Sequence, residues 1–319
     1  MKKSKELIVL TALGKSGPQL DYEFFKNFES EHTRISYRND IGQFLSFLKN
    51  YFPNRDQFER LHLVAFRNFL QEQNLAPKTI GRKLSALSSY FDFLVEKGMI
   101  DFNPATSVKR PRQEVISPTN DLSDEQIGEL LNSVDPKAPS APLHKAILFT
   151  LFYTGIRKSE LINLKLGDLK IVDKHKILEI RAKGGKFLQK VLHPECFDAI
   201  CDYLAWMESL DRKILPEDSL FQPTKNPKDP LLLKRHLTPK SIDYIVGIHC
   251  KKCGISERIS PHSARASYIG SSLEAGADLL TVSQDVGHSS VKTTEIYNKR
   301  RKALKESPAY LLRYFKKSA

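Results

Sequence analysis

Six side chains between residues 157 and 297 are of the types needed to break a DNA strand. The reaction requires an oxygen nucleophile, cations that neutralise a pentavalent phosphorane, and an acid that protonates the departing 5′-oxygen. A phenol can supply the nucleophile, guanidinium groups can grip two phosphate oxygens, and imidazole or ammonium groups can transfer protons. The six residues are Arg157, Lys183, His262, Arg265, His288 and Tyr297.

The expected helices place three of these groups where an anion can meet side chains and backbone amides. Arg157 follows Gly155 in a turn between two expected helices. His262 and Arg265 stand three apart in the first turn of a helix that begins after Ser260-Pro261. They therefore lie on one face, close to the positive end of the helix dipole.

A β-hairpin and a helix end are expected to carry the other three groups. Residues 177–181 and 187–192 are predicted to pair through the turn Lys183-Gly-Gly-Lys186, which places a lysine at the tip. His288 follows a glycine that is expected to end a helix, and Tyr297 comes nine residues later. Each residue alone has an ordinary structural explanation, such as a surface ion pair or a half-buried tyrosine. Their shared order along the chain is much harder to explain in that way.

Three stretches of the sequence resemble characteristic boxes of the tyrosine recombinases, also called the phage integrase family. They are Thr154-Gly-Ile-Arg157-Lys-Ser-Glu-Leu161, His262-Ser-Ala-Arg265 and Gly287-His288-Ser-Ser-Val-Lys-Thr-Thr-Glu-Ile-Tyr297. Residues from about 20 to 100 resemble the helical core-binding (SAM-like) domain, and residues from about 120 to 305 resemble the DNA breaking-rejoining catalytic domain. The resemblance implies a mainly α fold with a small β-hairpin or sheet in the catalytic domain.

The resemblance also implies a role for each residue. Tyr297 attacks the scissile phosphate and forms a 3′-phosphotyrosine, which frees a 5′-hydroxyl. Arg157 and Arg265 clamp the non-bridging oxygens, His262 accepts the proton of the tyrosine, and His288 hydrogen-bonds the phosphate. The phosphotyrosine retains the bond energy, so no cofactor, metal or ATP is expected. A 5′-hydroxyl from a second duplex then reverses the step and joins new partners.

The sequence departs from the family pattern in two places. Family members usually carry leucine before the second arginine and often histidine after it, where this chain has Ala264 and Ala266. Around the hairpin the family favours Lys-Gly-x-Lys-x-Arg, whereas Lys186 is followed by phenylalanine and leucine. The resemblance implies that Lys183 is the general acid for the 5′-oxygen, with Lys186 as the alternative.

The chain of 319 residues is expected to form two domains, because it is longer than one comfortable core and a proline-bearing basic segment follows its first helical region. Only about twenty residues precede that region, so no separate arm-site-binding domain is expected. This organisation resembles that of Xer-type, integron-type or transposon-type recombinases. The expected segments are an N-terminal extension (1–19), a core-binding domain (20–102), a basic linker (103–120), a catalytic domain (121–305) and a C-terminal tail (306–319).

The net charge of +13 favours a polyanionic partner. Residues 1–120 carry 18 basic and 13 acidic side chains and residues 121–319 carry 32 and 24, so both parts are basic. This distribution fits a two-domain clamp around double-stranded DNA, and a basic surface that only aids solubility is the alternative. The candidate DNA-binding residues are Lys78, Arg82, Lys83, Lys109, Arg110, Arg112 and Lys186.

The C-terminal stretch is also basic, with nine bases and two acids over residues 292–317, and it ends in an amphipathic segment. The family resemblance implies that such a tail docks on a neighbouring subunit within a homo- or hetero-tetramer on DNA. Packing of the tail on its own domain is the alternative.

Cysteine use and apolar content bear on the compartment. Four cysteines and no secretory pattern indicate a reduced protein, and no segment approaches the ~18 apolar residues of a membrane span. We therefore expect an intracellular protein, and the family resemblance implies a cytoplasmic, nucleoid-associated protein of a prokaryote. Cys250-Lys-Lys-Cys253 could be read as a zinc site, but no second Cys-x-x-Cys pair accompanies it, and buried inert cysteines are the favoured interpretation.

Three functions fit these residues. The favoured one is a site-specific recombinase that acts in integration, excision or resolution. A type IB topoisomerase uses a similar set of residues but only relaxes supercoils. A site-specific DNA-binding regulator that has lost catalysis would keep the fold without the chemistry, and the complete set of candidate residues argues against it.

Overall fold

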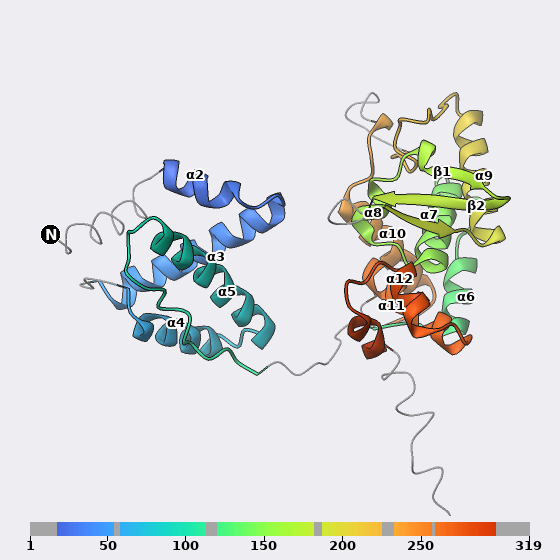
Figure 1. Cartoon of the computed structure of the whole chain (residues 1–319). Helices are drawn as coiled ribbons and strands as arrows, with labels where there is room; N and C mark the ends of the chain where they lie inside the picture. The colour runs from blue at the N-terminus through green and yellow to red at the C-terminus, as the bar shows by residue number, and fades with distance from the viewer. Residues whose placement is uncertain are drawn as a thin grey trace, which may run out of the picture. The chain divides into compact units, whose positions relative to one another are not determined.

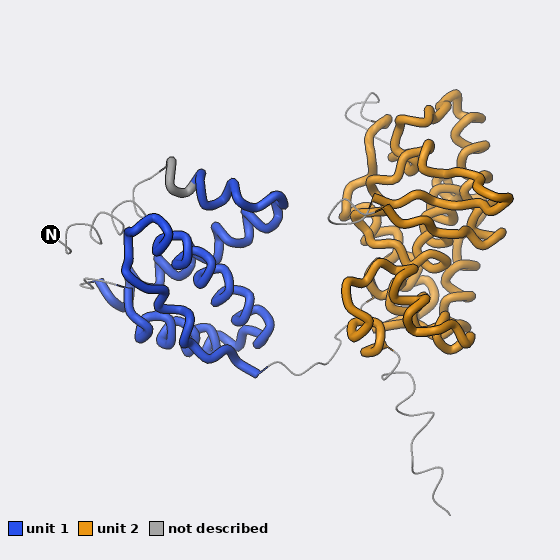
Figure 2. Tube along the Cα trace, in the orientation of Figure 1, with its two compact units in different colours: residues 1–115 blue, residues 116–319 orange. Residues whose placement is uncertain are grey.

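The chain divides into two compact units, residues 1–115 (unit 1) and residues 116–319 (unit 2), as Figures 1 and 2 show. Each unit has an apolar core of its own. Within the described residues, no helix has both the length and the apolar character that crossing a bilayer demands. The computed structural model describes residues 18–53, 58–112, 120–181, 187–224, 233–256 and 259–297.

Unit 1 is helical and has an aromatic core. Apolar residues at three- and four-residue spacing share one face of each helix, which confirms the helical domain expected over residues from about 20 to 100. Phe44 lies edge to face with Phe66 and Phe91, at centroid distances of 5.2 and 6.1 Å. The helices are α2 (Pro18–Lys26), α3 (Glu31–Tyr51), α4 (Arg60–Glu72) and α5 (Pro77–Glu96).

The segment after α5 stays on unit 1. Ala105 and Val108 are buried in its core, and Arg67 on α4 donates a hydrogen bond to the carbonyl of Lys109 at 3.1 Å. The first part of the segment predicted as a linker therefore packs on the helices. Its side chains at 109, 110 and 112 are exposed.

Unit 2 surrounds one apolar helix, α7. Because α7 is apolar on nearly every side, it is buried by its neighbours, which include α6, α9, α10 and α11. A further helical segment spans residues 291–297. The named helices are α6 (Asp124–Asn132), α7 (Ala141–Thr154), α8 (Lys158–Ile162), α9 (Pro194–Ser209), α10 (Pro239–Lys252), α11 (Pro261–Glu274) and α12 (Leu279–Asp285).

A three-stranded antiparallel sheet, in the order β1-β2-β3, completes unit 2. The predicted hairpin is present as β2 (His175–Arg181) and β3 (Phe187–Val191). The structure adds β1 (Leu169–Val172), which the sequence analysis missed. Asp173 and Lys174 join β1 to β2 with φ angles of +47° and +69°, a geometry that usually uses glycine or asparagine, so the usual turn signal is absent.

Helix caps fix where the elements of unit 2 begin. A capping box of Ser123 and Gln126 begins α6. Thr238, Ser260 and Asp278 cap α10, α11 and α12 by accepting hydrogen bonds from backbone amides. The cap at the start of α11 places residues 262 and 265 in its first turn.

Candidate functional site

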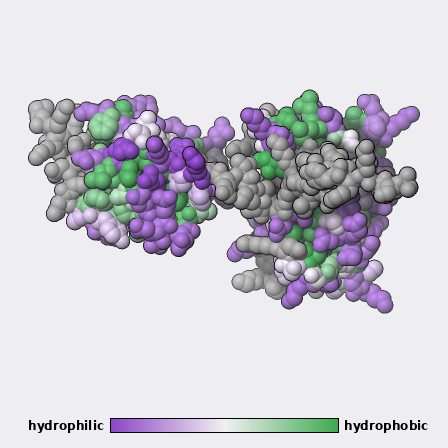
Figure 3. Space-filling model, turned by 90° about the horizontal axis from the view of Figure 1, so that it is seen from below, coloured by the Kyte–Doolittle hydropathy of each residue, from purple (hydrophilic) through white to green (hydrophobic). Residues whose placement is uncertain are grey.

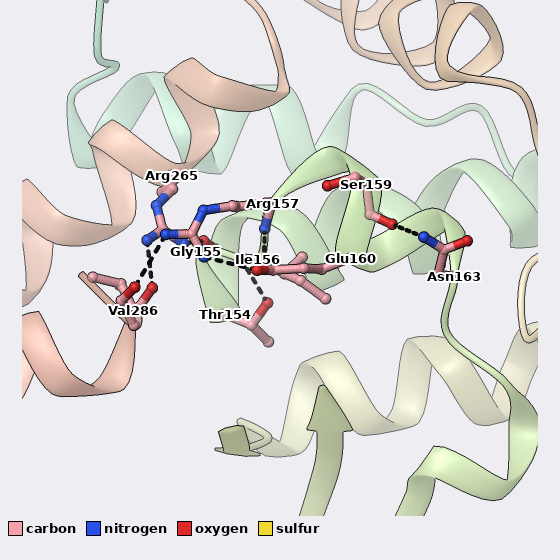
Figure 4. A network of polar contacts seen from close by, with 10 residues as sticks. Thr154, Gly155, Ile156, Arg157, Ser159, Glu160, Asn163, Arg265 and Val286 are labelled. Carbon is pink, nitrogen blue, oxygen red and sulfur yellow. Dashed lines mark hydrogen bonds and ion pairs between the residues drawn. The ribbon is translucent and has the colours of Figure 1, made fainter. Parts of the chain in front are cut away.

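Arg157 lies at the junction of α7 and α8, where Gly155 has a left-handed conformation (φ +57°) that ends α7. Glu160 in the first turn of α8 accepts hydrogen bonds from the Arg157 backbone N–H at 2.9 Å and from Nη1 at 2.7 Å (Figure 4). Nη2 donates to the carbonyl of Gly287 at 3.1 Å. The guanidinium is thus held in one orientation while about a third of the side chain stays exposed (35%).

Arg265 on α11 is buried, with 2% of its surface exposed. Its Nη1 donates to the Gly155 carbonyl at 2.8 Å, and its Nη2 donates to the Val286 carbonyl (Figure 4). Burial lowers the pKa of Arg265 to about 10, with a further contribution from the charge of Arg157. The group stays charged at neutral pH, so two guanidinium groups that repel one another are held together by backbone carbonyls. Such a pair is suited to an anion.

His288 follows the last turn of α12 and points its Nδ1 at the Thr294 hydroxyl, 2.8 Å away. Burial lowers the pKa of His288 to about 4, and the charges of Arg265 and Arg157 act in the same direction. The imidazole is therefore neutral at pH 7. When the threonine hydroxyl donates to Nδ1, the ring proton lies on Nε2, which can then donate to an anion.

Tyr297 ends the helical segment 291–297 and stacks near His288, with ring centroids 6.4 Å apart and planes inclined by 16°. The tyrosine ring packs against the small apolar cluster that includes Val282 and Val286. Burial raises the pKa of Tyr297, and the positive charge of Arg265 opposes that shift. The phenol is thus protonated at neutral pH and lies within the field of the buried arginine.

His262 lies one residue into α11 and is exposed. Its charge contributes to the lowered pKa of His288, which places it in the same neighbourhood. The structure therefore brings together five of the six residues singled out in the sequence. Lys183 and the alternative Lys186 lie outside the described residues.

Three residues that the sequence analysis did not single out support this site. Glu160 orients Arg157, Thr294 orients His288, and Lys190 of β3 is buried near both Arg265 and Glu160. The first two lie within the family-like boxes. Lys190 could have been found from strand alternation. It shares the inward face with Leu188 and with Leu192, which follows β3, whereas Phe187 and Val191 face outward.

Two of the predicted DNA-binding residues bond to a buried carboxylate. Arg82 and Lys83 both bind Asp40, which is 1% exposed: Arg82 donates through both Nη atoms, and Lys83 Nζ lies 2.8 Å from Oδ1. The side chain of Lys78 is exposed at the start of α5. The remaining members of the set are the exposed Lys109, Arg110 and Arg112, and Lys186, which is not among the described residues.

The Cys-x-x-Cys pair lies at the end of α10. Cys250 is buried and Cys253 is half-buried, and burial raises the pKa of the Cys250 thiol to about 11. The thiol is therefore protonated at neutral pH. Across the described ranges, no group of three or more His, Cys, Asp or Glu side chains is arranged to hold a metal ion.

Both units match known protein families. Residues 120–303 match the phage integrase family, and residues 23–98 match the phage integrase N-terminal SAM-like domain. Tyrosine recombinase XerC of Thermodesulfovibrio yellowstonii is 30% identical over 275 residues, which cover 84% of this chain and 86% of that protein. Tyrosine recombinase XerD of Vibrio cholerae is 29% identical over 279 residues, covering 87% and 89%.

Solved structures share the fold. XerH site-specific recombinase bound to palindromic difH substrate aligns with a TM-score of 0.72 at 18% identity, covering 88% of this chain and 80% of that chain. A lambda integrase tetramer bound to a Holliday junction aligns with a TM-score of 0.64 at 16% identity, covering 88% and 75%. Since the family match spans more than half of the chain and the relatives align over most of its length, this protein belongs to the phage integrase family of tyrosine recombinases.

Proposed function

We propose that this protein is a site-specific DNA recombinase that cleaves and rejoins DNA through a 3′-phosphotyrosine at Tyr297. One observation carries the proposal: the buried Arg265, the oriented Arg157 and the neutral His288 meet beside a protonated tyrosine. Two fixed guanidinium groups suit the non-bridging oxygens of a phosphodiester, and a phenol beside them is a suitable nucleophile. Membership of the tyrosine recombinase family supports the same reaction.

In the proposed reaction, the Tyr297 oxygen attacks phosphorus as its proton passes to His262. Arg157 and Arg265 neutralise the charge that develops on the non-bridging oxygens, and His288 donates a hydrogen bond to one of them. The bond from phosphorus to the 5′-oxygen breaks, and that oxygen takes a proton from Lys183, with Lys186 as the alternative donor. A 5′-hydroxyl of another duplex then attacks the phosphotyrosine and restores a phosphodiester and a free phenol.

The ionisation states fit these roles. A raised pKa keeps Tyr297 protonated before the attack, so the reaction needs a proton acceptor, and His262 is exposed nearby. A lowered pKa keeps His288 neutral, which suits a hydrogen-bond donor that does not exchange protons. Because the covalent intermediate retains the bond energy, the proposed cycle uses no cofactor and no ATP.

Double-stranded DNA is the proposed partner of both units, and two duplexes are proposed to meet in a tetramer. Basic side chains on each unit favour DNA, and hydrophilic side chains occur on both units in the described parts of the face shown in Figure 3. The structures that share the fold include a tetramer bound to a Holliday junction. The named relatives come from bacteria, and we propose that this protein likewise acts in the cytoplasm on the nucleoid.

The proposed division of labour follows the expected segments. Residues 20–102 would bind the outer part of a recombination site, residues 103–120 would link the units across the duplex, and residues 121–305 would carry the chemistry. The tail, residues 306–319, would dock on a neighbouring subunit. The phosphate contacts proposed for unit 1 and the linker come from the exposed Lys78, Lys109, Arg110 and Arg112, whereas the predicted residues Arg82 and Lys83 bond to Asp40.

Covalent trapping tests the proposal directly. Wild-type protein is incubated with a pool of duplexes whose flanking sequences are taken from the DNA beside its own gene. Each duplex carries a nick, so the short fragment released by cleavage diffuses away and the covalent adduct is trapped. Duplexes that stay bound after denaturation are sequenced, which identifies the cleaved site. We expect adducts with wild-type protein and none with Tyr297→Phe. Equal adduct yields from both proteins would place the nucleophile elsewhere.

The same proteins separate the two rival functions. A type IB topoisomerase would keep relaxing a supercoiled plasmid that lacks the trapped sequence, whereas the recombinase is expected to leave that plasmid supercoiled. A regulator without catalysis would bind the DNA beside its gene but give no adduct. Either result would overturn the proposed recombinase.

A further inference from the structure

The ammonium group of Lys190 is buried inside unit 2, where it is 2% exposed. It lies on β3 opposite Leu178 of β2, on a strand face that also carries Ile180, so an apolar residue would be expected there. An isolated ammonium in such surroundings is strongly destabilising. A buried charge at this position therefore calls for specific partners.

Those partners come from two helices. Asp285 at the end of α12 accepts a hydrogen bond from Lys190 Nζ at 2.5 Å and another from the Tyr268 hydroxyl of α11 at 2.8 Å. The ammonium also lies 5.0 Å from the centroid of the Tyr268 ring. One carboxylate thus ties together β3, α11 and α12. We refer to Lys190, Tyr268 and Asp285 as the Asp285 network.

The charges of this network balance. Burial lowers the pKa of Lys190, while the Asp285 carboxylate opposes that shift. Burial and the same carboxylate raise the pKa of Tyr268, so the phenol remains a neutral donor. Lys190 and Asp285 form an ion pair, and the neutral Tyr268 phenol donates to the same carboxylate. Asp285 keeps part of its side chain exposed (30%).

The network flanks both backbone carbonyls that hold Arg265. Asp285 immediately precedes Val286, whose carbonyl accepts from Nη2. The Tyr268 ring lies against Gly155, whose carbonyl accepts from Nη1: a β-carbon at Gly155 would lie only 2.5 Å from Cδ1 of that ring. A shift of the carboxylate or the tyrosine would therefore move the acceptors that set the position of the guanidinium.

Arg157 is coupled to the same segment. Its Nη2 donates to the carbonyl of Gly287, two residues after Asp285. Gly287 also packs tightly on β3, because a β-carbon there would lie 2.6 Å from Leu188 Cδ1. The strand that carries Lys190 thus contacts the 285–287 segment at two points.

We propose that the Asp285 network is a positioning device for the arginine pair. Lys190, Asp285 and Tyr268 fix the carbonyls of Gly155 and Val286, and through them the guanidinium groups that receive the scissile phosphate. The inference rests on the proposed function, since it assigns the arginines to a phosphate. Lys190 itself touches no substrate, because its ammonium is enclosed by Asp285 and Tyr268.

The test uses full-length Lys190→Met, Asp285→Asn and Tyr268→Phe proteins and the duplex trapped by wild-type protein. Lys170→Met is the matched control, because Lys170 pairs with Glu179 at the exposed side of the same sheet. Single-turnover cleavage is expected to slow by about 10-fold to 100-fold in the first two variants, while the Kd for DNA changes less than about 3-fold. Tyr268→Phe keeps its ring packing, so it should fold and show a smaller defect, whereas Lys170→Met should cleave at the wild-type rate.

A modified substrate separates positioning from general loss of structure. A methylphosphonate at the scissile position replaces one charged oxygen with a neutral methyl group, so less charge needs a guanidinium partner. We expect the rate deficit of the network variants to shrink at least about fivefold on this duplex. An undiminished deficit, or wild-type cleavage of the phosphodiester by all three variants, would overturn the inference. Failure of wild-type protein to form any adduct would instead overturn the proposed recombinase.

Discussion

Nη1 of Arg265 donates a hydrogen bond to the carbonyl oxygen of Gly155 at 2.8 Å, so α11 is tied to the turn that carries Arg157. The turn depends on a left-handed residue: Gly155 has a φ of +57° and ends α7. A single backbone position therefore controls both the helix end and the acceptor for a buried guanidinium.

Gly155→Ala tests this connection. A side chain at positive φ costs about 1–3 kcal/mol, and the new methyl group would also collide with the Tyr268 ring. We expect a lower urea midpoint for unit 2 and a loss of adduct formation even at temperatures where the variant stays folded. The fluorescence of Trp206, the single tryptophan of the chain, reports the unfolding of unit 2.

Gly247→Ala is the matched control for that substitution. Gly247 lies within α10, and a β-carbon there meets nothing within 4 Å. The exchange should stabilise the helix by up to about 1 kcal/mol and leave cleavage unchanged. A Gly155→Ala protein that matched this control in both measurements would contradict the role given to the turn.

Glu160→Gln is expected to slow cleavage by about 10-fold to 100-fold with a much smaller effect on DNA affinity. The amide keeps the size of the side chain but has only one acceptor oxygen, whereas the carboxylate accepts from both the backbone and Nη1 of Arg157. Single-turnover cleavage and a gel-shift Kd measure the two effects separately. Asp243→Asn is the control, because it removes an exposed ion pair with Lys158 and should change the rate less than about twofold. Equal rates for the two variants would count against orientation by Glu160.

Much of the site could be predicted because its residues follow helix caps and glycine-ended turns, which are local signals. His262 and Arg265 fall in the first turn of α11 as the Ser260 cap predicts. The inward-facing Lys190 was missed because its partner Asp285 is 95 residues away, and only the fold brings them together. Strand β1 was missed because its turn lacks a glycine. Long-range charge pairs and unusual turns are the features that local patterns do not encode.

The basic residues of α5 should separate into DNA contacts and structural ion pairs. Lys78 is exposed, so Lys78→Ala should weaken binding to a random-sequence duplex and reduce the slope of log Kd against log salt by about one. Lys83→Ala should leave the slope nearly unchanged, because this ammonium bonds to the buried Asp40. The substitution leaves the Asp40 carboxylate with fewer hydrogen bonds, which should lower the stability by about 1–3 kcal/mol. This loss should appear as faster hydrogen exchange in α3 and α5. A reduced salt slope in Lys83→Ala together with an unchanged slope in Lys78→Ala would contradict this division.

The stability of unit 2 should fall as pH drops below 6.5. Burial lowers the pKa of His288 and of His249 to about 4 from an ordinary value of 6.5, so the unfolded chain binds protons that the folded chain excludes. The resulting stabilisation is complete above pH 6.5 and is lost as pH falls towards 4, which amounts to about 2 kcal/mol per histidine between pH 6.5 and 5.

Urea unfolding followed by Trp206 fluorescence measures the slope of stability against pH. His288→Asn should reduce the slope, whereas His175→Gln, which removes an exposed histidine of β2, should retain it. An unchanged slope in His288→Asn would mean that His288 is protonated in the folded protein near pH 6, contrary to its role as a neutral donor.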